Sequence, residues 1–160
     1  RHFIRDRAEL AARADDVTRV VHARTGVVMT QGGALGPLAL ATRLGAGATI
    51  ATGRHQLPWI SLPDEARAIV HLLERSELSG PVNLTGPEPA TWDDMTRALA
   101  RALRRPHLFR LPEWLLRLVM GEVAEEMLLP DQRVPPARLQ ADGFRFTHPT
   151  VHEAVAQAYG

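Results

Sequence analysis

Glycines between two apolar stretches are the first residues whose type and spacing could support chemistry. Gly32, Gly33 and Gly36 follow a valine-rich segment and precede an apolar one, where a loop between a strand and a helix can bind phosphate. Their spacing differs from that of a dinucleotide-binding loop or a P-loop, and neither pattern occurs elsewhere in the 160 residues. A flexible loop is the simpler interpretation, with a phosphate site as its alternative.

Histidine and serine offer no stronger pattern. His148 and His152 lie four residues apart, but Pro149 and a predicted helix cap at Thr150 place them on different stretches of backbone, which argues against a metal site. The chain has no Gly-x-Ser-x-Gly motif, so nothing supports a serine hydrolase. We therefore predict neither catalytic residues nor a metal site within these 160 residues.

Composition narrows the class of protein. The chain has 45% hydrophobic residues, 19 basic and 18 acidic residues and no cysteine. All the basic residues are arginine, and they form no basic run, so we expect no nucleic-acid partner. No apolar run approaches the ~20 residues of a membrane helix, so we also expect no membrane contact and a cytoplasmic location.

The elements that must position any site alternate between strands and helices. Hydrophobic and turn patterns predict strands at 17–29, 48–52, 58–62, 81–85 and 107–111, and helices at 1–14, 38–44, 112–121, 122–129 and 136–141. This alternation predicts an α/β chain with mainly parallel pairing in its first half. We divide the chain into an α/β segment at 1–104 and a helix-rich tail at 105–160.

Three further helices begin at capping boxes, in which a hydroxyl and a carboxylate three residues apart bond to each other's backbone. The pairs are Ser61 with Asp64, Thr91 with Asp94, and Thr150 with Glu153. After the first cap, four apolar residues form one stripe of an amphipathic helix: Ala66, Ile69, Val70 and Leu73. The faces expected to be buried on the other two helices are Met95, Ala98, Leu99, Ala102 and Leu103, and Val151, Ala154, Val155 and Ala158.

The tail resembles the C-terminal segment of atypical extended short-chain dehydrogenase/reductases, the nucleoside-diphosphate-sugar epimerase-like proteins. The family pattern Gln-Arg-Val-x-Pro-x-x-Leu-x-x-x-Gly-Phe-x-Phe-x-x-Pro begins here at Gln132 and ends at Pro149. The stretches "RTGVVMTQGGAL", "PWISLPD" and "GPVNLTGPEP" are similar to further family segments. The resemblance covers about residues 17–155 and implies the C-terminal part of a Rossmann-like fold with a helix-rich, substrate-side lobe.

The resemblance also implies a site. Three residues would contact the nicotinamide: Thr25, Gly26 and Val28. Five would border the substrate: Met29, Thr30, Arg54, Gln56 and Trp59. For Trp59 a wall of the cleft and a core anchor are both open interpretations, and we favour the cleft. Such a protein would use NAD or NADP and a small-molecule substrate such as a nucleotide sugar, and could form a homodimer.

The chain departs from the family at several points. Ser61 replaces a usual histidine and Pro63 a frequent aspartate, and a Tyr-x-x-x-Lys pair is impossible without lysine. The glycine-rich cofactor loop belongs to an N-terminal Rossmann half that we expect to be missing here. We therefore expect no cofactor on this chain alone and an epimerase- or reductase-like substrate-side part, inactive in isolation. The alternative is a non-catalytic binding or regulatory module on the same scaffold.

Overall fold

The computed structural model describes residues 19–45, 47–50, 54–74, 76–111 and 133–160. Its strands are β1 (Val21–Thr25), β2 (Val27–Met29), β3 (Gly47–Ile50), β4 (Gln56–Leu57), β5 (Trp59–Ser61), β6 (Gly80–Leu84), β7 (Ala90–Thr91) and β8 (His107–Leu111). Its helices are the 3-10 turn η1 (Gly33–Leu35), α2 (Gly36–Arg43), α3 (Leu62–Glu74), α4 (Trp92–Ala102), α7 (Ala137–Ala141) and α8 (Val151–Tyr159). The helices predicted at 1–14, 112–121 and 122–129 lie outside the described residues.

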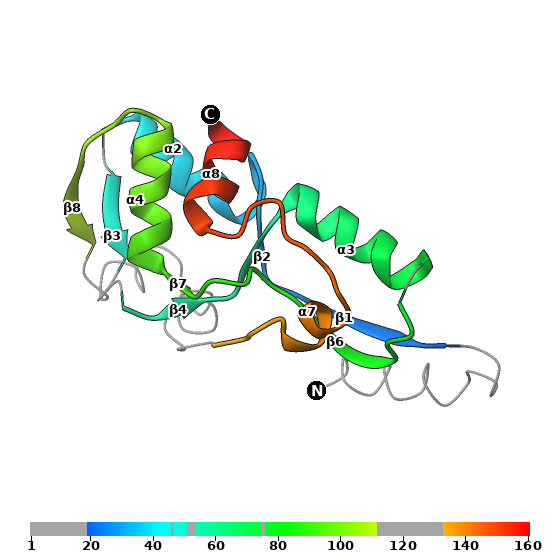
Figure 1. Ribbon diagram of the computed structural model, residues 1–160. Helices are drawn as coiled ribbons and strands as arrows, with labels where there is room; N and C mark the ends of the chain where they lie inside the picture. Colours follow the sequence, from blue (N-terminus) through cyan, green and yellow to red (C-terminus); the bar gives the residue numbers. More distant parts are fainter. Residues whose placement is uncertain (1–18, 46, 51–53, 75, 112–132) are drawn as a thin grey trace, which may run out of the picture.

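The elements form two lobes joined by the β2–β5 ladder (Figure 1). We call the group of α2, α4 and α8 with β3 and β8 the α4–α8 lobe. We call the group of α3, α7, β1 and β6 the α3 lobe. Of the four strand pairs in the described residues, three are parallel, namely β1–β6, β2–β5 and β3–β8, while β4–β7 is antiparallel. The prediction of an α/β chain with mainly parallel pairing is confirmed.

The strand predicted at 17–29 is two strands, so its prediction as one element is wrong. β1 pairs with β6, β2 pairs with β5, and Gly26 stands between them. The Gly26 amide donates to the Leu84 carbonyl and the Val27 amide donates to Pro58, so the hydrogen-bond partner changes at this point. A side chain on Gly26 would collide with the Pro58 backbone at 2.8 Å. The glycine thus lets the chain pass from one lobe to the other.

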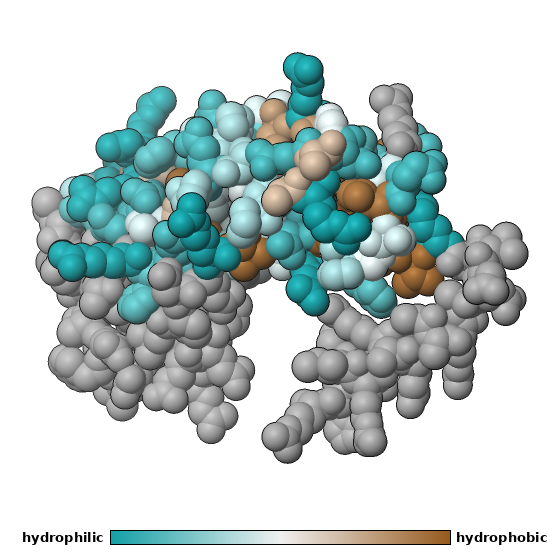
Figure 2. All heavy atoms as spheres, turned by 60° about the horizontal axis from the view of Figure 1, so that its bottom comes forward, coloured by the Kyte–Doolittle hydropathy of each residue, from teal (hydrophilic) through white to brown (hydrophobic). Residues whose placement is uncertain are grey.

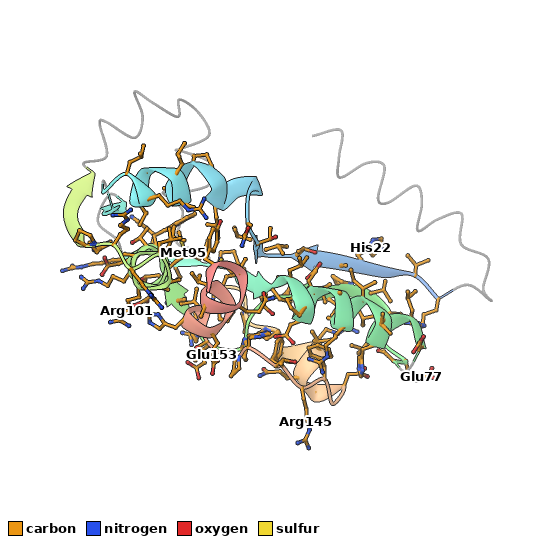
Figure 3. The ribbon with its side chains drawn as sticks, turned by 90° about the horizontal axis from the view of Figure 1, so that it is seen from above. His22, Glu77, Met95, Arg101, Arg145 and Glu153 are labelled. Atoms are coloured by element: carbon orange, nitrogen blue, oxygen red, sulfur yellow. The ribbon has the colours of Figure 1, made fainter. Side chains whose placement is uncertain are left out.

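Apolar packing forms the core of the α4–α8 lobe. The two predicted capping boxes in this lobe are complete, at Thr91 with Asp94 and at Thr150 with Glu153. The predicted inner faces are confirmed: Met95, Ala98, Leu99, Val151, Ala154 and Val155 are buried, and Ala102, Leu103 and Ala158 pack against them. Figure 3 labels Met95 on α4, whose side chain is fully buried.

Helix α3 presents a different face to the core from the one that its apolar stripe indicates. Asp64, Ala68 and Leu72 are buried. Ile69 and Val70 are 43% and 49% exposed, and Leu73 is 73% exposed. The apolar stripe therefore does not pack on the core. The reason is that β5, β6 and the tail occupy the other side of the helix, where a small alanine and a hydrogen-bonded aspartate fit.

The Asp64 carboxylate holds the tail against α3. Its two oxygens accept hydrogen bonds from the backbone amides of Thr147 and His148, each at 2.9 Å, and Arg67 donates to it at 2.7 Å. The Ser61 hydroxyl accepts a hydrogen bond from the Asp64 amide at 3.2 Å, so one half of the predicted capping box forms. The Asp64 carboxylate, which would supply the other half, binds the tail instead. Burial raises the pKa of Asp64, but the hydrogen bonds from the Thr147 and His148 amides and from the Ser61 and Thr147 side chains together lower it below its usual value.

Next to this clamp, the tail also packs through aromatic rings. Phe144 is 7% exposed, and its ring meets that of Phe146 edge-on, with centroids 5.0 Å apart. Both rings therefore face the core of the α3 lobe, as their alternation around Arg145 predicts, and Arg145 points away from the molecule (Figure 3). Nearby, His71 and Asp142 form a pair at 2.7 Å that joins α3 to the end of α7.

Neither a membrane span nor a metal cluster is found in the part of the chain that the structure describes. None of its helices combines the length and apolar character needed to cross a bilayer. In the same residues, no three histidine, cysteine or acidic side chains gather as metal ligands would. On the face shown in Figure 2, hydrophobic residues form separate patches among hydrophilic ones.

Candidate functional site

Two adjoining cavities lie where β1 and β6 end. The larger has a volume of about 340 Å³ and is lined by Arg24, Thr25, Gly26, Asn83 and Arg133 among others. The smaller, of about 170 Å³, is lined by Gln56, Trp59, Gly86 and Glu88 among others. Five residues line both cavities: Pro58, Thr85, Arg133, Val134 and Pro135. Ligands of open α/β sheets bind at the carboxyl ends of the parallel strands, which is where these cavities lie.

Thr25 is fixed in this position by α3. Its hydroxyl donates to Glu65 Oε1 at 2.8 Å, which leaves the lone pairs of the hydroxyl available to a ligand. Burial raises the pKa of the Glu65 carboxyl, although the hydrogen bond from Thr25 acts in the opposite direction. The other oxygen of Glu65 is buried and has no hydrogen-bond partner in the described residues. A carboxyl with raised pKa therefore stands directly behind the cavity wall.

Trp59 combines the two interpretations that the sequence left open. Its side chain is 1% exposed and belongs to the core of the α4–α8 lobe, yet it lines the smaller cavity. The indole nitrogen donates to the Glu88 carbonyl at 3.0 Å, which fixes the ring. A side chain on Gly86 would come within 2.5 Å of the indole, so the glycine lets the following loop lie against the ring. Trp59 is a core residue that also borders the cavity.

The other predicted site residues are spread between the cavities and the core. Gln56 lines the smaller cavity from β4. Met29 is fully buried, and Val28 is half-buried against the core of the α3 lobe. The Thr30 carbonyl accepts a hydrogen bond from the Tyr159 hydroxyl. Arg54 is exposed and is not among the residues that line the two cavities. Thr25, Gly26, Gln56 and Trp59 are thus the predicted residues that the structure brings together.

Sequence reasoning missed most of the polar lining. Asn83 and Thr85 alternate along β6 and its end, and both bond to the tail: the Asn83 amide donates to the Pro135 carbonyl and the Thr85 hydroxyl to the Val134 carbonyl. These bonds hold Arg133 at the cavity. Both the "GPVNLTGPEP" stretch and the Gln-Arg-Val motif were identified as family features, but nothing in either indicates that they meet across about 50 residues.

Ser61, Asp64 and His148 form a trio that resembles a nucleophile, an acid and a base. His148 Nδ1 lies 3.2 Å from Ser61 Oγ and 3.6 Å from Asp64 Oδ2. In a catalytic triad the base uses one ring nitrogen for the nucleophile and the other for the acid, whereas here one nitrogen faces both. Ser61 is also fully buried. The trio is therefore part of the clamp on the tail and offers no nucleophile to solvent.

Parallel strands that alternate with helices, with a cavity at the strand ends, define a Rossmann-like α/β architecture. A solved structure of the human epimerase family protein SDR39U1 with NADPH shares this fold, with a TM-score of 0.87 and 34% identity over 98% of this chain and 54% of that one. The epimerase family protein of Mycobacterium leprae is 44% identical over 142 residues, which is 88% of this chain and 46% of the relative. SDR39U1 of Bos taurus is 39% identical over 152 residues, or 93% of this chain and 52% of the relative.

The tail matches a family model as well, the Domain of unknown function (DUF1731), over residues 111–158. The chain is therefore similar to the epimerase family of atypical extended short-chain dehydrogenase/reductases, as the tail pattern predicted. It spans about half the length of the curated relatives that it matches.

Proposed function

We propose that this chain is the substrate-side, C-terminal part of an NAD(P)-dependent nucleoside-diphosphate-sugar epimerase- or reductase-like protein, and that it is inactive alone. The observation that carries the proposal is the β1–β6 ladder. Among the described residues β1 pairs with β6 alone, and Ala23, Arg24 and Thr25 at the end of β1 are exposed. Parallel sheets normally have more strands and are covered on both faces. A Rossmann half with further strands beside β1 would complete such a sheet.

The outer face of α3 supports the same proposal. Leu62, Ile69 and Leu73 are separated by seven and four residues, so they lie on one side of the helix. Their exposure of 49%, 43% and 73% leaves an apolar strip that no other part of the described structure covers. Large contiguous apolar patches on a protein commonly mark interaction sites. The proposed Rossmann half accounts for the strip as a surface that it covers.

The residues present fit one end of a dinucleotide. Thr25 and Gly26 line the larger cavity at the strand ends, where the nicotinamide end would lie, and Glu65 orients the Thr25 hydroxyl there. No glycine-rich diphosphate loop occurs in the 160 residues, so the other end needs a different segment. When bound, NAD(P) supplies hydride transfer. The chain's own contribution would be to position the substrate and to exclude water beside Trp59.

A chimera tests the proposal. The N-terminal half of human SDR39U1 would be joined to this chain, and NADPH and NADH would be titrated into the chimera, the chain alone and the human half alone by calorimetry. We expect micromolar binding of one cofactor by the chimera and none by the 160-residue chain. A folded chimera that binds neither cofactor, or a chain that binds one alone with micromolar affinity, would contradict the proposal.

A further inference from the structure

A patch of arginines lies at the C-terminal end of α4, in the α4–α8 lobe. It consists of Arg97, Arg101, Arg104 and Arg105, all of which are exposed. Arg97 and Arg101 are four residues apart and share one face of the helix, and the other two follow directly after its last turn. The chain has no acidic residue between 94 and 113, although its acidic and basic residues are nearly equal in number. We call these four residues the arginine patch.

Three arginines of the patch have no side-chain partner in the described part of the chain. Arg97 donates to Asp93 at 2.7 Å. The side chains of Arg101, Arg104 and Arg105 make no hydrogen bond or ion pair with the described residues. The acidic residues that cap α4 and α8 are bound within their own capping boxes and neutralise none of them. Three guanidinium groups are therefore available to a partner.

The backbone at Arg104 gives an independent indication of function. Its φ of 52° lies in the left-handed region, which no other non-glycine residue adopts among the described residues. The Arg104 amide donates to the Arg101 carbonyl at 3.0 Å, and the Arg105 amide donates to the Ala100 carbonyl at 2.9 Å. This is the Schellman ending of a helix, where glycine is the usual residue because a side chain is strained there.

Helix stability does not explain the patch. The helix macrodipole favours a cation in the last turn, which accounts for Arg101. At position 104 the same fold would be more stable with glycine, so the arginine adds charge to the patch at the expense of stability. Backbone strain that is retained in this way commonly marks a functional position.

The patch remains exposed in the proposed two-part protein. The lobe that carries it lies at the opposite end of the molecule from α3 and β1 (Figure 1). A Rossmann half that continued the sheet beside β1 and covered α3 would therefore leave the end of α4 free. The inference that follows does not rest on the proposed function.

The number of free charges indicates the class of partner. Nucleic acids are bound through their phosphates with on the order of 6–10 contacts, and membrane surfaces by about 4–8 basic residues, with a second, apolar signal for stable attachment. The large hydrophobic residues that are exposed in the described structure include none on α4. A protein interface of about 800 Å² on each side needs fewer charges, because a few arginines among its contacts can supply much of the affinity.

We propose that the arginine patch binds an acidic helix of another protein, with Arg101, Arg104 and Arg105 paired to its carboxylates. A guanidinium group donates two parallel hydrogen bonds to one carboxylate, which gives such a pair a defined geometry. Arg97 and Arg101 are about 6 Å apart along the axis of α4, and glutamates four residues apart on a second helix have the same spacing.

A synthetic helical peptide tests the proposal. It carries glutamate at every fourth position among alanine and glutamine, and it is titrated into the ¹⁵N-labelled 160-residue chain at low ionic strength. We expect saturable shifts at the amides of residues 101–105, with a dissociation constant below about 1 mM. A peptide with glutamine in place of every glutamate should cause none. Arg101→Gln and Arg105→Gln should each weaken binding about two- to fivefold, as for a solvent-exposed ion pair.

Arg104→Gly separates binding from stability. It removes a charge and the backbone strain together, so the melting temperature should rise while the affinity for the peptide falls. Arg104→Lys keeps both the charge and the side chain, and should leave the melting temperature unchanged and most of the affinity intact. If Arg104→Gly raises the melting temperature and leaves the affinity unchanged, the patch does not bind the peptide as proposed.

The control for charge is Arg145→Gln, at an exposed arginine of the other lobe that points away from the molecule (Figure 3). It should leave the affinity for the peptide unchanged. Equal weakening by this variant, or a titration without saturable shifts, would overturn the proposal. A single-stranded oligonucleotide or phosphatidylserine vesicles that bind through the same arginines at physiological salt, where the peptide does not, would also overturn it and would assign the patch to a nucleic acid or a membrane.

Discussion

The two lobes are stabilised in different ways. In the α4–α8 lobe, buried side chains from α2, α4, α8 and β5 form one apolar core, which contains both Trp59 and Met95. The α3 lobe has a smaller core and depends on long-range polar contacts, among them the Asp64 clamp and the His71–Asp142 pair. Both lobes leave apolar residues exposed, among them Leu40 and Leu44 at α2 and Ile69 and Leu73 on α3. The comparison indicates that the first lobe is stabilised mainly by apolar packing, whereas the second depends more on polar contacts with the tail.

The largest expected effect is at Trp59, where the first lobe meets the cavity. Trp59→Ala removes a side chain that is 1% exposed and hydrogen-bonded to Glu88. The free energy of unfolding should fall by about 3–5 kcal/mol, as for other buried large-to-alanine changes. Urea unfolding followed by circular dichroism measures it. A loss below about 1 kcal/mol would show that the indole is not part of the core and would restore the interpretation of Trp59 as an open cleft wall.

Two adjacent leucines test the orientation of α3. Leu72 is 5% exposed and Leu73 is 73% exposed. Leu72→Ala should lower the free energy of unfolding by about 2–5 kcal/mol, whereas Leu73→Ala should change it by less than about 0.5 kcal/mol. The same urea experiment compares the two variants. The reverse order would mean that the apolar stripe faces the core after all.

Asp64→Asn tests the polar clamp. The carboxylate accepts bonds from Thr147, His148 and Arg67, so its neutralisation should cost about 1.5–3 kcal/mol. Arg97→Gln is the control, since it removes the surface ion pair that the exposed Arg97 forms with Asp93 within α4, and it should cost less than about 0.5 kcal/mol. If the two substitutions have equal effects on urea unfolding, the clamp does not hold the tail.

The clamp also predicts a dependence on pH. The pKa of Asp64 is lower in the folded state than its usual value of 3.8. The contribution of its carboxylate to the free energy of unfolding is therefore complete above that value. It is lost as the pH falls through the folded pKa, because the unfolded chain then binds the proton more readily. Urea midpoints of the wild type and Asp64→Asn should therefore differ most near neutral pH and converge in acid. A difference that stays constant down to acid pH would contradict this account.

The smallest expected effect is at Ser61. Its hydroxyl accepts from the Asp64 amide at the start of α3, so Ser61→Ala should cost about 0.5–2 kcal/mol, as for the loss of a helix cap. Ser61→Thr, which retains the hydroxyl, is the matched variant and should retain most of the stability. Thermal melts of both variants measure the difference. A larger loss for threonine than for alanine would indicate that packing, not capping, selects serine here.

Local patterns predicted the elements of the first lobe better than those of the second. The boxes at Thr91 and Thr150 depend on residues three apart, so the sequence alone reveals them. The Asp64 clamp joins residues 83 and 84 positions apart, and no local pattern records such a partner. For α3, periodicity identifies an apolar stripe, but it cannot say whether the stripe or the Ala68–Leu72 side meets the sheet.

The candidate site could be predicted only in part, because some of its residues also meet across long separations in the sequence. The resemblance indicated Thr25 and Gly26, which line the larger cavity. It gave no role to Arg133, because that residue reaches the cavity only when Thr85 binds the tail. The exact point at which one long strand divides into β1 and β2 depends on Gly26, whose close contact with Pro58 is visible only in three dimensions.

We propose, above all, that this chain is one half of a longer epimerase-like polypeptide. The intact mass of the native protein, purified from its source and measured by mass spectrometry, tests this claim most directly. We expect a single polypeptide about twice the 17.6 kDa of this chain, since relatives match it over about half of their length. A native polypeptide of 17.6 kDa, with no second polypeptide bound to it, would contradict the account.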